Sequence, residues 1–466
     1  MGSLFGALGT ALSSLLANGG AIQVTANNIA NANTPGYSRQ QVNLAENAPL
    51  VIGSLVLGTG VSLESVQAVR DQVLELQIQQ QMQDQGQLNA FAGGINQVQA
   101  LFNETQGSGL QSALSQFFAS LQSLSTDPTN LTLRQAVLDA GQNLADAFNS
   151  EASGLQQAQS GLDQSVPQTV GQINQLTSQI AAVNAQIAQL QPAAQSASGF
   201  IDQRNQLIEQ LSNLVGVSVV SANDGTVTLT TTSGTALVVG QQSFALQSQV
   251  DPSSGLQHVF AQGVDITSSL TGGELGGTLQ ARDQAIPAVQ AQLDNLAASL
   301  GSAFNAQNAA GFDLSGAPGG NFFVPFVQPS PGSNAGAAAQ FAVAITDPSK
   351  IAASSDGTAG SNGNALALAA LQNQPVVGGQ TVTGYYASMI GSIGSQAANA
   401  QSQQQAEQLV VQQLQNQKAS VSGVSLDEEA ANLVQFQNAY DAAARVFSVV
   451  DQLTQTAIGL GSQGVG

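Results

Sequence analysis

Residues 22–41, IQVTANNIANANTPGYSRQQ, determine how this chain is organised, because they close a helical pattern with a block of turn residues. Pro35 fixes φ at the first central position of a turn, and Gly36 can adopt the positive φ that a type II turn needs at the second. Because the residue before a proline is pushed out of the helical region, we expect the preceding helix to end by about Asn33.

Four asparagines precede this turn, at Asn27, Asn28, Asn31 and Asn33. Asparagine side chains compete for backbone hydrogen bonds and favour helix ends and turns. A helix that tolerates four of them is predicted to use them for hydrogen bonds to groups outside itself. The alternative, an ordinary helix C-terminus followed by a turn, accounts for the proline and the glycine but not for the asparagines.

The order ANNIANANTPGYSRQ, residues 26–40, closely resembles the N-terminal signature of bacterial flagellar axial proteins, which include rod, hook and hook-associated proteins. The continuation Ser38-Arg39-Gln40 is similar to the FlgK family of hook-associated proteins rather than to hook or rod proteins. Ala26 departs from the signature, since many relatives carry serine there. The motif is long and its order unusual, so the resemblance is specific.

Residues 3–31, which lead into this signature, carry apolar or small residues at alternating steps of four and three, the heptad seam of a coiled coil. Much of the opposite face is Gly, Ala, Ser and Asn, so a lone helix of this composition is marginal in water. We therefore expect it to be poorly ordered until a partner covers the seam. The seam consists of Leu8, Leu12, Leu15, Gly19, Ile22, Ala26 and Ile29.

The other end of the chain repeats this pattern. Residues 421–424 break a helix, and Ser425 with Glu428 forms a capping box whose acidic first turn suits the positive helix end. The stretch SGVSLDEEAANLVQFQNAYDAAARVFSVVDQL, residues 422–453, closely resembles the C-terminal helix of the FlgK family. Its seam consists of Leu433, Phe436, Tyr440, Ala443, Phe447, Val450, Thr454 and Ala457.

The resemblance implies that the two terminal helices pair into a coiled coil and pack with neighbouring subunits into a tube. The assembly interface is accordingly predicted at both ends of the chain. Its candidate residues are Leu8, Leu12, Leu15, Ile22, Asn27, Asn28, Ile29, Asn31, Asn33, Thr34, Pro35, Gly36 and Tyr37 at one end, and Leu426, Leu433, Phe436, Tyr440, Phe447 and Val450 at the other.

The middle of the chain predicts a mainly α protein with an inserted β domain. Helical periods cover residues 63–102, 110–124, 131–150, 155–190 and 200–214, typical of an elongated bundle, and Pro167 is predicted to kink or begin a helix. At Val215 the period becomes alternating, and Asn223-Asp224-Gly225 is a hairpin signal. Residues 272–323 return to helix and again resemble the FlgK family, with GGELGG at the start and NAQ before GFD.

These patterns divide the chain into four parts. Residues 1–60 with 422–466 form a terminal coiled-coil core, and residues 61–214 with 273–312 and 360–421 form the helical bundle. Residues 215–272 form the small β domain. Residues 313–359 are mostly loop-like, with a strand expected at 341–345.

Composition excludes several classes of function. Lys and Arg number 8 against 28 Asp and Glu, and the net charge is −20, which argues against nucleic acid and anionic membranes as partners. The sequence has no cysteine and therefore no disulfide framework. Polar faces built from Gln, Asn, Ser and Thr suit either packing against copies of the same chain or a soluble acidic protein. Arg39 is the first basic residue, so no secretory signal is expected, nor any membrane insertion.

We find no catalytic set, and we expect no enzyme, cofactor or metal site. The one histidine, His258, cannot supply a His-pair metal site and is interpreted as a surface residue. The acid pair Glu428 and Glu429 is explained more simply by helix capping than by acid–base chemistry.

The resemblance implies a structural subunit at the hook–filament junction, exported by the flagellar type III apparatus to the extracellular flagellum. It also implies self-association, contacts with the hook protein and hook-associated protein 3, and a FlgN-type chaperone that shields the C-terminal helix. Two alternatives stay open. One is a hook or rod subunit of the same superfamily, and the other is an exported adhesin or enzyme with flagellar-type ends.

Overall fold

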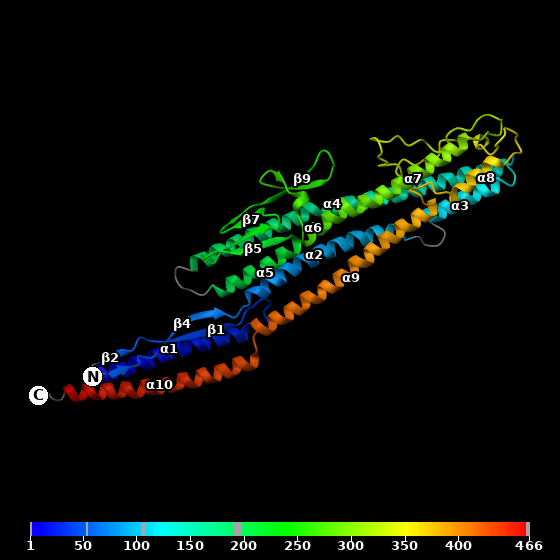
Figure 1. The fold of residues 1–466 in the computed structure, drawn as a ribbon. Helices are drawn as coiled ribbons and strands as arrows, with labels where there is room; N and C mark the ends of the chain where they lie inside the picture. Colours follow the sequence, from blue (N-terminus) through cyan, green and yellow to red (C-terminus); the bar gives the residue numbers. More distant parts are fainter. Residues whose placement is uncertain (1, 53–54, 104–108, 191–196, 463–466) are drawn as a thin grey trace. The chain divides into compact units, whose positions relative to one another are not determined.

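The computed structural model describes residues 2–52, 55–103, 109–190 and 197–462. The fold is mainly helical with short antiparallel sheets, as the sequence predicted (Figure 1). The chain forms two compact units. The first comprises Met1–Gln83, Ile173–Ala245 and Gln408–Gly466, and the second comprises Asp84–Gln172 and Leu246–Glu407.

The α-helices include three long ones, α2, α4 and α9, each of which contributes residues to both units. Their bounds are α1 (Gly2–Ala30), α2 (Gln72–Leu101), α3 (Leu110–Leu124), α4 (Leu131–Leu190), α5 (Ser198–Leu214), α6 (Gly273–Gln280), α7 (Ile286–Ala309), α8 (Gly363–Ala370), α9 (Val382–Ser422) and α10 (Leu426–Ser462). Short helical turns lie at η2 (Thr267–Ser269), η4 (Pro348–Lys350) and η5 (Leu371–Asn373), and η3 (Ala281–Ala285) is a π-helix.

In the first unit the two ends of the chain lie side by side, because α1 packs along α10 (Figure 1). A Cβ built on Gly19 would lie 3.7 Å from the ring of Tyr440, which places these two helices in direct contact. The antiparallel pair β1 (Gln40–Glu46) and β4 (Val61–Ala68) also packs on α1. Gly60, at φ +100°, lets the chain approach the backbone of Thr10, since a Cβ there would lie 3.2 Å from its Cα. Between β1 and β4 lies the small hairpin β2 (Leu50–Ile52) and β3 (Leu55–Leu57).

The face that α1 buries within its own chain is made of small and polar residues. All of the buried positions except Ala17 lie one residue before a position of the predicted seam. The larger apolar side chains are left partly or largely outside, with Leu12 47% and Leu16 70% exposed. Small side chains let α10 and the β1–β4 pair approach α1 closely, so the bulkier stripe is turned away. The buried positions are Ala11, Ala17, Asn18, Ala21, Thr25 and Asn28.

The first unit also contains a four-stranded antiparallel sheet in the order β5-β6-β7-β8. The predicted hairpin at 223–225 is confirmed, with Gly225 at φ +77° and a hydrogen bond from the Ala222 N–H to the Thr226 carbonyl at 2.9 Å. The strands are β5 (Val217–Ser221), β6 (Val227–Thr231), β7 (Ala236–Val239) and β8 (Gln242–Ser243).

The second unit has a core rich in phenylalanine. Phe117 lies 5.1 Å from Phe304 between ring centroids, and Phe323 lies 4.5 Å from Phe341. Phe323 and Phe341 belong to the irregular segment at 313–359, so aromatic packing rather than a sheet fixes that segment on α7 and α3. A three-stranded antiparallel sheet, ordered β11-β10-β9, comprises β9 (Leu246–Val250), β10 (Gln257–Ala261) and β11 (Val264–Asp265).

Two local predictions were wrong, and so was one alternative of a third. Helix was expected from residue 63, but Val61–Ala68 is a strand, because its spacing fits either structure and pairing with distant β1 decides. Pro167 was predicted to kink or begin a helix, and it does not begin one, because it lies inside α4 between the buried residues Val166 and Val170. Residues 341–345 form one isolated bridge, Phe323 with Val343, rather than a strand. Pro325 nearby has no N–H with which to extend that pairing.

Candidate assembly site

The turn after α1 has the predicted geometry. Gly36 adopts φ +76°, and the Tyr37 N–H donates to the Thr34 carbonyl at 3.2 Å, as in a type II turn. Gln206 of α5 donates from its side-chain amide to the Pro35 carbonyl. The turn is thereby attached to a helix about 170 residues further along the chain.

Asn28, which is 1% exposed, is the centre of the polar contacts around this turn. Its Oδ1 accepts from the Tyr37 hydroxyl at 2.8 Å and from the Gln40 N–H at 2.9 Å. Its Nδ2 donates to the Gln40 carbonyl at 2.8 Å and to Glu429 Oε2 of α10 at 3.1 Å. All four hydrogen-bonding positions of the amide are therefore filled. Its partners lie outside α1, as predicted for the asparagine run.

A buried carboxylate holds the residue after the turn. Asp202 of α5 accepts from the Ser38 N–H at 3.0 Å and from the Ser38 hydroxyl at 2.7 Å. Arg70 donates to the same carboxylate from Nε at 3.0 Å and from Nη2 at 2.7 Å. Asp202 is 8% exposed, so its charge is stabilised by these donors rather than by water.

The α9–α10 break lies next to this network. The Arg39 N–H donates to the Ser422 carbonyl at 2.8 Å, and the Arg39 guanidinium forms an ion pair with Glu428. The predicted capping box is present in part. The Glu428 N–H bonds Ser425 Oγ at 3.4 Å, while the Glu428 carboxylate turns to Arg39. The connected group Asn28, Tyr37, Ser38, Arg70, Asp202 and Glu429 is called the terminal joint below.

Charge and burial in the terminal joint act on Tyr37. Burial, followed by the nearby Asp202 and Glu429 carboxylates, raises the pKa of Tyr37 to about 12. The folded state therefore keeps the phenol protonated. The resulting stability is fully present below pH 10, near the ordinary tyrosine pKa, and is lost as the pH rises through about 12.

This shift predicts a separate late step in an alkaline titration. An alkaline titration followed at 295 nm is expected to show Tyr37 ionising with a midpoint near pH 12, and Tyr37→Phe is expected to reduce the amplitude of that late step by one tyrosinate. Tyr440→Phe, at a 40% exposed tyrosine, is the matched control and should leave the late step in place. A late step of unchanged amplitude in Tyr37→Phe would contradict the contacts described for Tyr37.

Gly36 gives a second prediction. A Cβ at this position would lie 1.7 Å from Gln206 Nε2, and φ +76° is unfavourable for an alanine. Gly36→Ala is expected to lower the free energy of unfolding by about 2 kcal/mol, combining left-handed strain with the displaced Gln206. Gly234→Ala, at φ +92° with open space around it, measures the strain alone and should cost less. If urea titration shows the same loss of unfolding free energy in Gly36→Ala and Gly234→Ala, the result would contradict a role for the Gln206 contact.

The structure brings together part of the candidate interface. Asn27, Asn28 and Tyr37 contact one another, while Asn31 bonds back to Asn27 and Thr34 bonds to Asn31. Leu8, Leu15, Ile22, Ile29, Leu433, Phe436 and Phe447 are half-buried along the α1–α10 pair, Val450 is buried, and Leu12, Asn33, Thr34, Pro35, Gly36, Leu426 and Tyr440 are exposed. Whether these residues contact neighbouring subunits stays a prediction.

Sequence reasoning missed the charged half of the terminal joint. Nothing in the sequence marked Arg70 and Asp202 as site residues, because no spacing rule connects the turn at residues 34–37 to α5, which is far along the chain. Glu429 was interpreted as helix capping, but it is 3% exposed and bonds Asn28. A buried carboxylate in the first turn of a helix needs a partner, which could have suggested a contact with the asparagine run.

The described residues offer no convincing catalytic geometry. His258 Nδ1 lies 2.7 Å from Asp265, and Ser254 Oγ lies 3.4 Å from His258 Nε2, with Asp251 also 4.0 Å from that nitrogen. This serine contact is longer than an activated nucleophile needs, and the carboxylate of Asp251 competes for the same nitrogen. In the described parts of the chain, no group of three or more acidic or histidine side chains could hold a metal ion.

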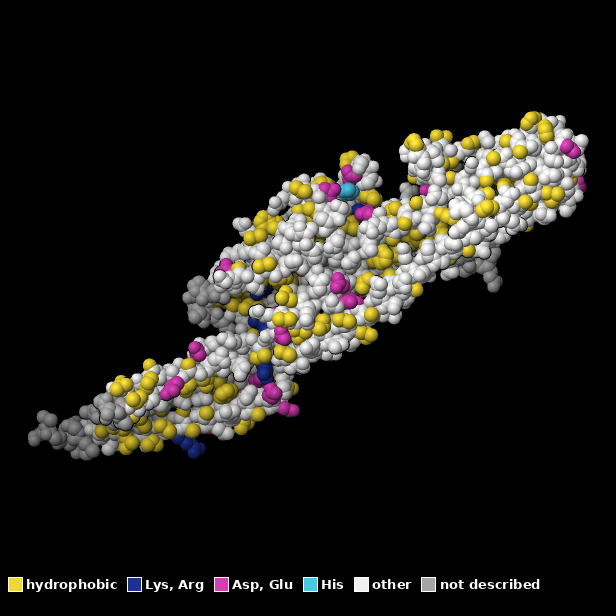
Figure 2. Space-filling model, viewed as in Figure 1, with side chains coloured by type: hydrophobic (Ala, Val, Ile, Leu, Met, Phe, Trp, Pro, Cys, Tyr) yellow, Lys and Arg dark blue, Asp and Glu magenta, His cyan; other side chains and the backbone are white. Residues whose placement is uncertain are grey.

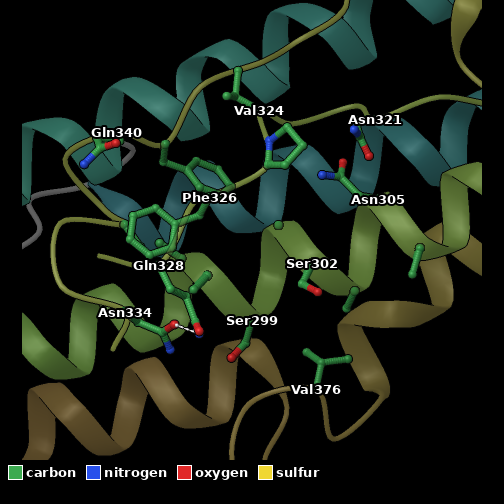
Figure 3. Close-up of a pocket in the computed structure, with 18 residues that line it drawn as sticks. Ser299, Ser302, Asn305, Asn321, Val324, Phe326, Gln328, Asn334, Gln340 and Val376 are labelled. Atoms are coloured by element: carbon green, nitrogen blue, oxygen red, sulfur yellow. Dashed lines mark hydrogen bonds between the residues drawn. The ribbon is translucent and has the colours of Figure 1, made fainter. Parts of the chain in front are cut away.

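A groove of about 680 Å³ runs along α7 in the second unit (Figure 3). Its lining contains small side chains and neutral amides, including Asn305, Asn321 and Gln340, together with Phe326. The lining residues include no charged side chain and no histidine, so this groove offers no acid–base chemistry.

One helix segment in the described residues, Leu4–Ala30, is long and apolar enough by length and composition to cross a membrane. In the structure this segment is α1, which packs against α10 and the β1–β4 pair. Figure 2 shows hydrophobic side chains along this helix pair.

Comparisons with known proteins agree with this arrangement. Residues 8–37 match the flagella basal body rod protein family, and residues 415–460 match the C-terminal domain described for the flagellar basal body rod FlgEFG proteins. Residues 95–323 match the helical domain of flagellar hook-associated protein FlgK. Paired rod-type ends around a long helical middle define a structural subunit of the extracellular flagellum rather than an enzyme.

Two relatives extend over nearly the whole chain. The chain is 33% identical to flagellar hook-associated protein 1 of Bacillus subtilis over 100% of both chains. It is 29% identical to the protein of that name in Escherichia coli, covering 97% of this chain and 99% of the relative. The chain belongs to the flagellar hook-associated protein 1 family.

A solved structure supports the fold. The flagellar hook junction protein FlgK from Burkholderia pseudomallei aligns with a TM-score of 0.66 and 21% identity, covering 74% of this chain and 100% of that chain.

Proposed function

We propose that this chain forms the junction between flagellar hook and filament, and that its paired terminal helices are the part that self-associates. The observation that carries the proposal is the set of large apolar side chains that α1 and α10 leave outside their own contact. They are Phe5 54%, Leu12 47% and Leu16 70% exposed on α1, and Val434 56%, Val446 51%, Val449 55% and Leu453 52% exposed on α10.

The spacing of these exposed residues supports packing against further helices. Leu12 and Leu16 lie four residues apart, and Val446, Val449 and Leu453 follow steps of three and four, so each set lies on one helix face. Each such side chain would contribute about 1 kcal/mol if neighbouring subunits covered its exposed half. Such a surface is stable in a tube and is poorly suited to a dilute monomer.

Family membership supports the partners and the route that we propose. The partners are copies of the same chain, the hook protein and hook-associated protein 3. Before assembly, the C-terminal helix would be shielded by a FlgN-type chaperone during type III export. Long helices are compatible with passage through a narrow channel, because a helix without its tertiary contacts is only marginally stable.

Limited proteolysis tests the assembly step. Because the chain has 8 Lys and Arg in total, chymotrypsin is more informative than trypsin. In dilute monomer the α1–α10 pair is expected to open transiently, so chymotrypsin should cut α10 at Phe436, Tyr440 and Phe447 faster than in the assembled chain. Full protection of both terminal helices in dilute monomer would count against assembly-dependent ordering.

A complementation experiment tests the junction itself. A strain lacking this chain is expected to be non-motile and to secrete unpolymerised flagellin. The wild-type chain should restore motility, and Val449→Glu should not. Val327→Glu, at an 84% exposed valine of the second unit, is the matched control and should restore motility. Antibody labelling should place the chain where hook meets filament. Labelling along the whole hook or rod would favour a hook or rod subunit instead.

A further inference from the structure

A cavity of about 310 Å³ lies within the first unit, and Arg70 of the terminal joint is among the residues that line it. The other lining residues include Glu75 and Gln79 of α2, Arg204 of α5, and Val219, Ser221 and Val227 of the β5–β6 hairpin. Two of its side chains are more than nine-tenths buried and carry an unpaired polar atom. Buried polar groups normally have partners, so each such atom needs an explanation.

Arg204 is 7% exposed, and only part of its guanidinium makes hydrogen bonds. Its Nη1 donates to the Gly225 carbonyl at 2.6 Å and to Asn184 Oδ1 at 3.2 Å, which fixes the guanidinium. Its Nε makes no hydrogen bond to any described residue. Nε and Nη2 together form the side of a guanidinium that binds a carboxylate through two parallel hydrogen bonds.

Burial makes the positive charge of Arg204 energetically unfavourable. Burial, followed by the like charge of Arg70 and opposed by Glu75, lowers the pKa of Arg204 to about 10. Arg204 therefore stays charged at neutral pH, yet its nearest acidic neighbour in the cavity, Glu75, bonds Asn205 instead at 2.9 Å. A carboxylate brought to the unused side would stabilise this charge.

The second unpaired atom is an acceptor. Gln79 is 6% exposed, and its Oε1 accepts no hydrogen bond within the residues that the structure describes. The cavity thus presents both a buried donor and a buried acceptor. A peptide segment with one acidic side chain can satisfy both, through its carboxylate and one of its N–H groups.

The strand that borders the cavity has an open edge. Just after β5, the Ala222 N–H donates to the Thr226 carbonyl across the hairpin. The backbone N–H and C=O groups of successive residues in an antiparallel strand point alternately toward and away from the partner strand, so those of Val219 and Ser221 point away from β6. The carbonyl of Val217, two residues before Val219, also points away from β6 and accepts a hydrogen bond from Gln83 Nε2 at 2.8 Å. The sheet order ends at β5, and Ser221 is exposed. An open strand edge of this kind pairs with an added strand.

We propose that this cavity docks a short extended segment of a partner protein that carries one Glu or Asp side chain. The segment's backbone pairs with Val219 and Ser221, its carboxylate takes the Nε side of Arg204, and one of its N–H groups donates to Gln79 Oε1. The small volume admits one acidic side chain with its adjoining backbone and excludes a helix. No covalent step is involved.

The test uses the full-length chain and a synthetic acetylated, amidated pentapeptide, Val-Thr-Glu-Thr-Val. With ¹⁵N-labelled protein, the peptide should shift the amide signals of Val219 and Ser221 and the side-chain Nε signal of Arg204. Replacing the peptide's Glu by Gln should weaken binding at least about tenfold, since a charge-assisted pair becomes neutral. Free glutamate should bind more weakly than the peptide.

Two variants separate the two halves of the site. Arg204→Lys keeps the positive charge but loses the paired N–H donors at Nε and Nη2. This variant should bind the Glu and Gln peptides equally well. Ser221→Pro removes an N–H that points out of the sheet, so the fold should persist while peptide binding is lost. Val220→Thr, at the neighbouring residue, is the matched control and should bind normally. Equal binding of the Glu and Gln peptides, or free glutamate binding as tightly as the peptide, would overturn the proposal.

Discussion

Replacing Asp202 by alanine is expected to lower the free energy of unfolding of the first unit by about 3–5 kcal/mol, because it leaves a buried partner charge uncompensated. Asp202 accepts from both the N–H and the hydroxyl of Ser38 and from two nitrogens of Arg70. The Arg70 side chain is 14% exposed, so water reaches it poorly once the carboxylate is gone. The turn at residues 34–37 would then keep only its Gln206 contact with α5.

Hydrogen–deuterium exchange measures this effect by unit. Peptides from α1 and the turn should exchange faster in Asp202→Ala, while peptides from α7 in the second unit should be unchanged. Asp202→Asn retains one acceptor oxygen, so it should lower the free energy of unfolding less than Asp202→Ala does. Asp283→Ala is the matched control, since Asp283 also pairs with an arginine but belongs to the second unit. Unchanged exchange in α1 for Asp202→Ala would contradict the role given to this carboxylate.

Replacing Asn28 by leucine is expected to cost about 3 kcal/mol or more, because several buried groups lose their partner at once. The Gln40 N–H and carbonyl, the Tyr37 hydroxyl and Glu429 all bond this one amide. Glu429 is the costliest of these, since a carboxylate that is 3% exposed would be left unpaired. The start of α10 should therefore separate from α1.

Asn27→Ala is the matched control for this prediction. Asn27 lies one residue away and bonds Tyr37 at a longer 3.5 Å, so its loss should cost much less. Chymotrypsin cleavage at Phe436 should become faster in Asn28→Leu and stay near the wild-type rate in Asn27→Ala. Similar rates in both variants would show that the Asn28 amide does not hold the two helices together.

Local chemistry was sufficient to predict several features. Pro35 and Gly36 specified the turn, and Asn223-Asp224-Gly225 specified the β5–β6 hairpin, because both depend on φ preferences of neighbouring residues. The helix break at 421–424 was visible for the same reason. The packing of α1 on α10 followed from resemblance to a known family together with two heptad seams, and the structure confirms it.

Features that depend on distant partners could not be predicted. The spacing at residues 61–68 fits a helix or a strand, and pairing with β1 selects the strand. The buried face of α1 follows the small residues Ala11, Ala21 and Thr25 rather than the leucine stripe, because a close neighbour selects small side chains. Asp202 is separated from Ser38 by 164 positions, and no local pattern links them.

The same limit explains the long α4 helix. Pro167 was predicted to kink or begin a helix, and local preference alone favours a start there. Buried Val166 and Val170 lie on either side of it, so tertiary packing overrides the local preference. A sequence without an alignment contains no signal that distinguishes these two outcomes.

Crosslinking of the two chain ends tests the central claim most directly, because the natural sequence has no cysteine. Gly19→Cys and Tyr440→Cys place two thiols at the contact between α1 and α10. With a short bis-maleimide reagent in dilute solution, the paired helices predict a crosslink within one chain, seen as a faster-migrating monomer and a single linked peptide pair. Crosslinks that form exclusively between chains, or none at all, would contradict the pairing of the two ends in one subunit.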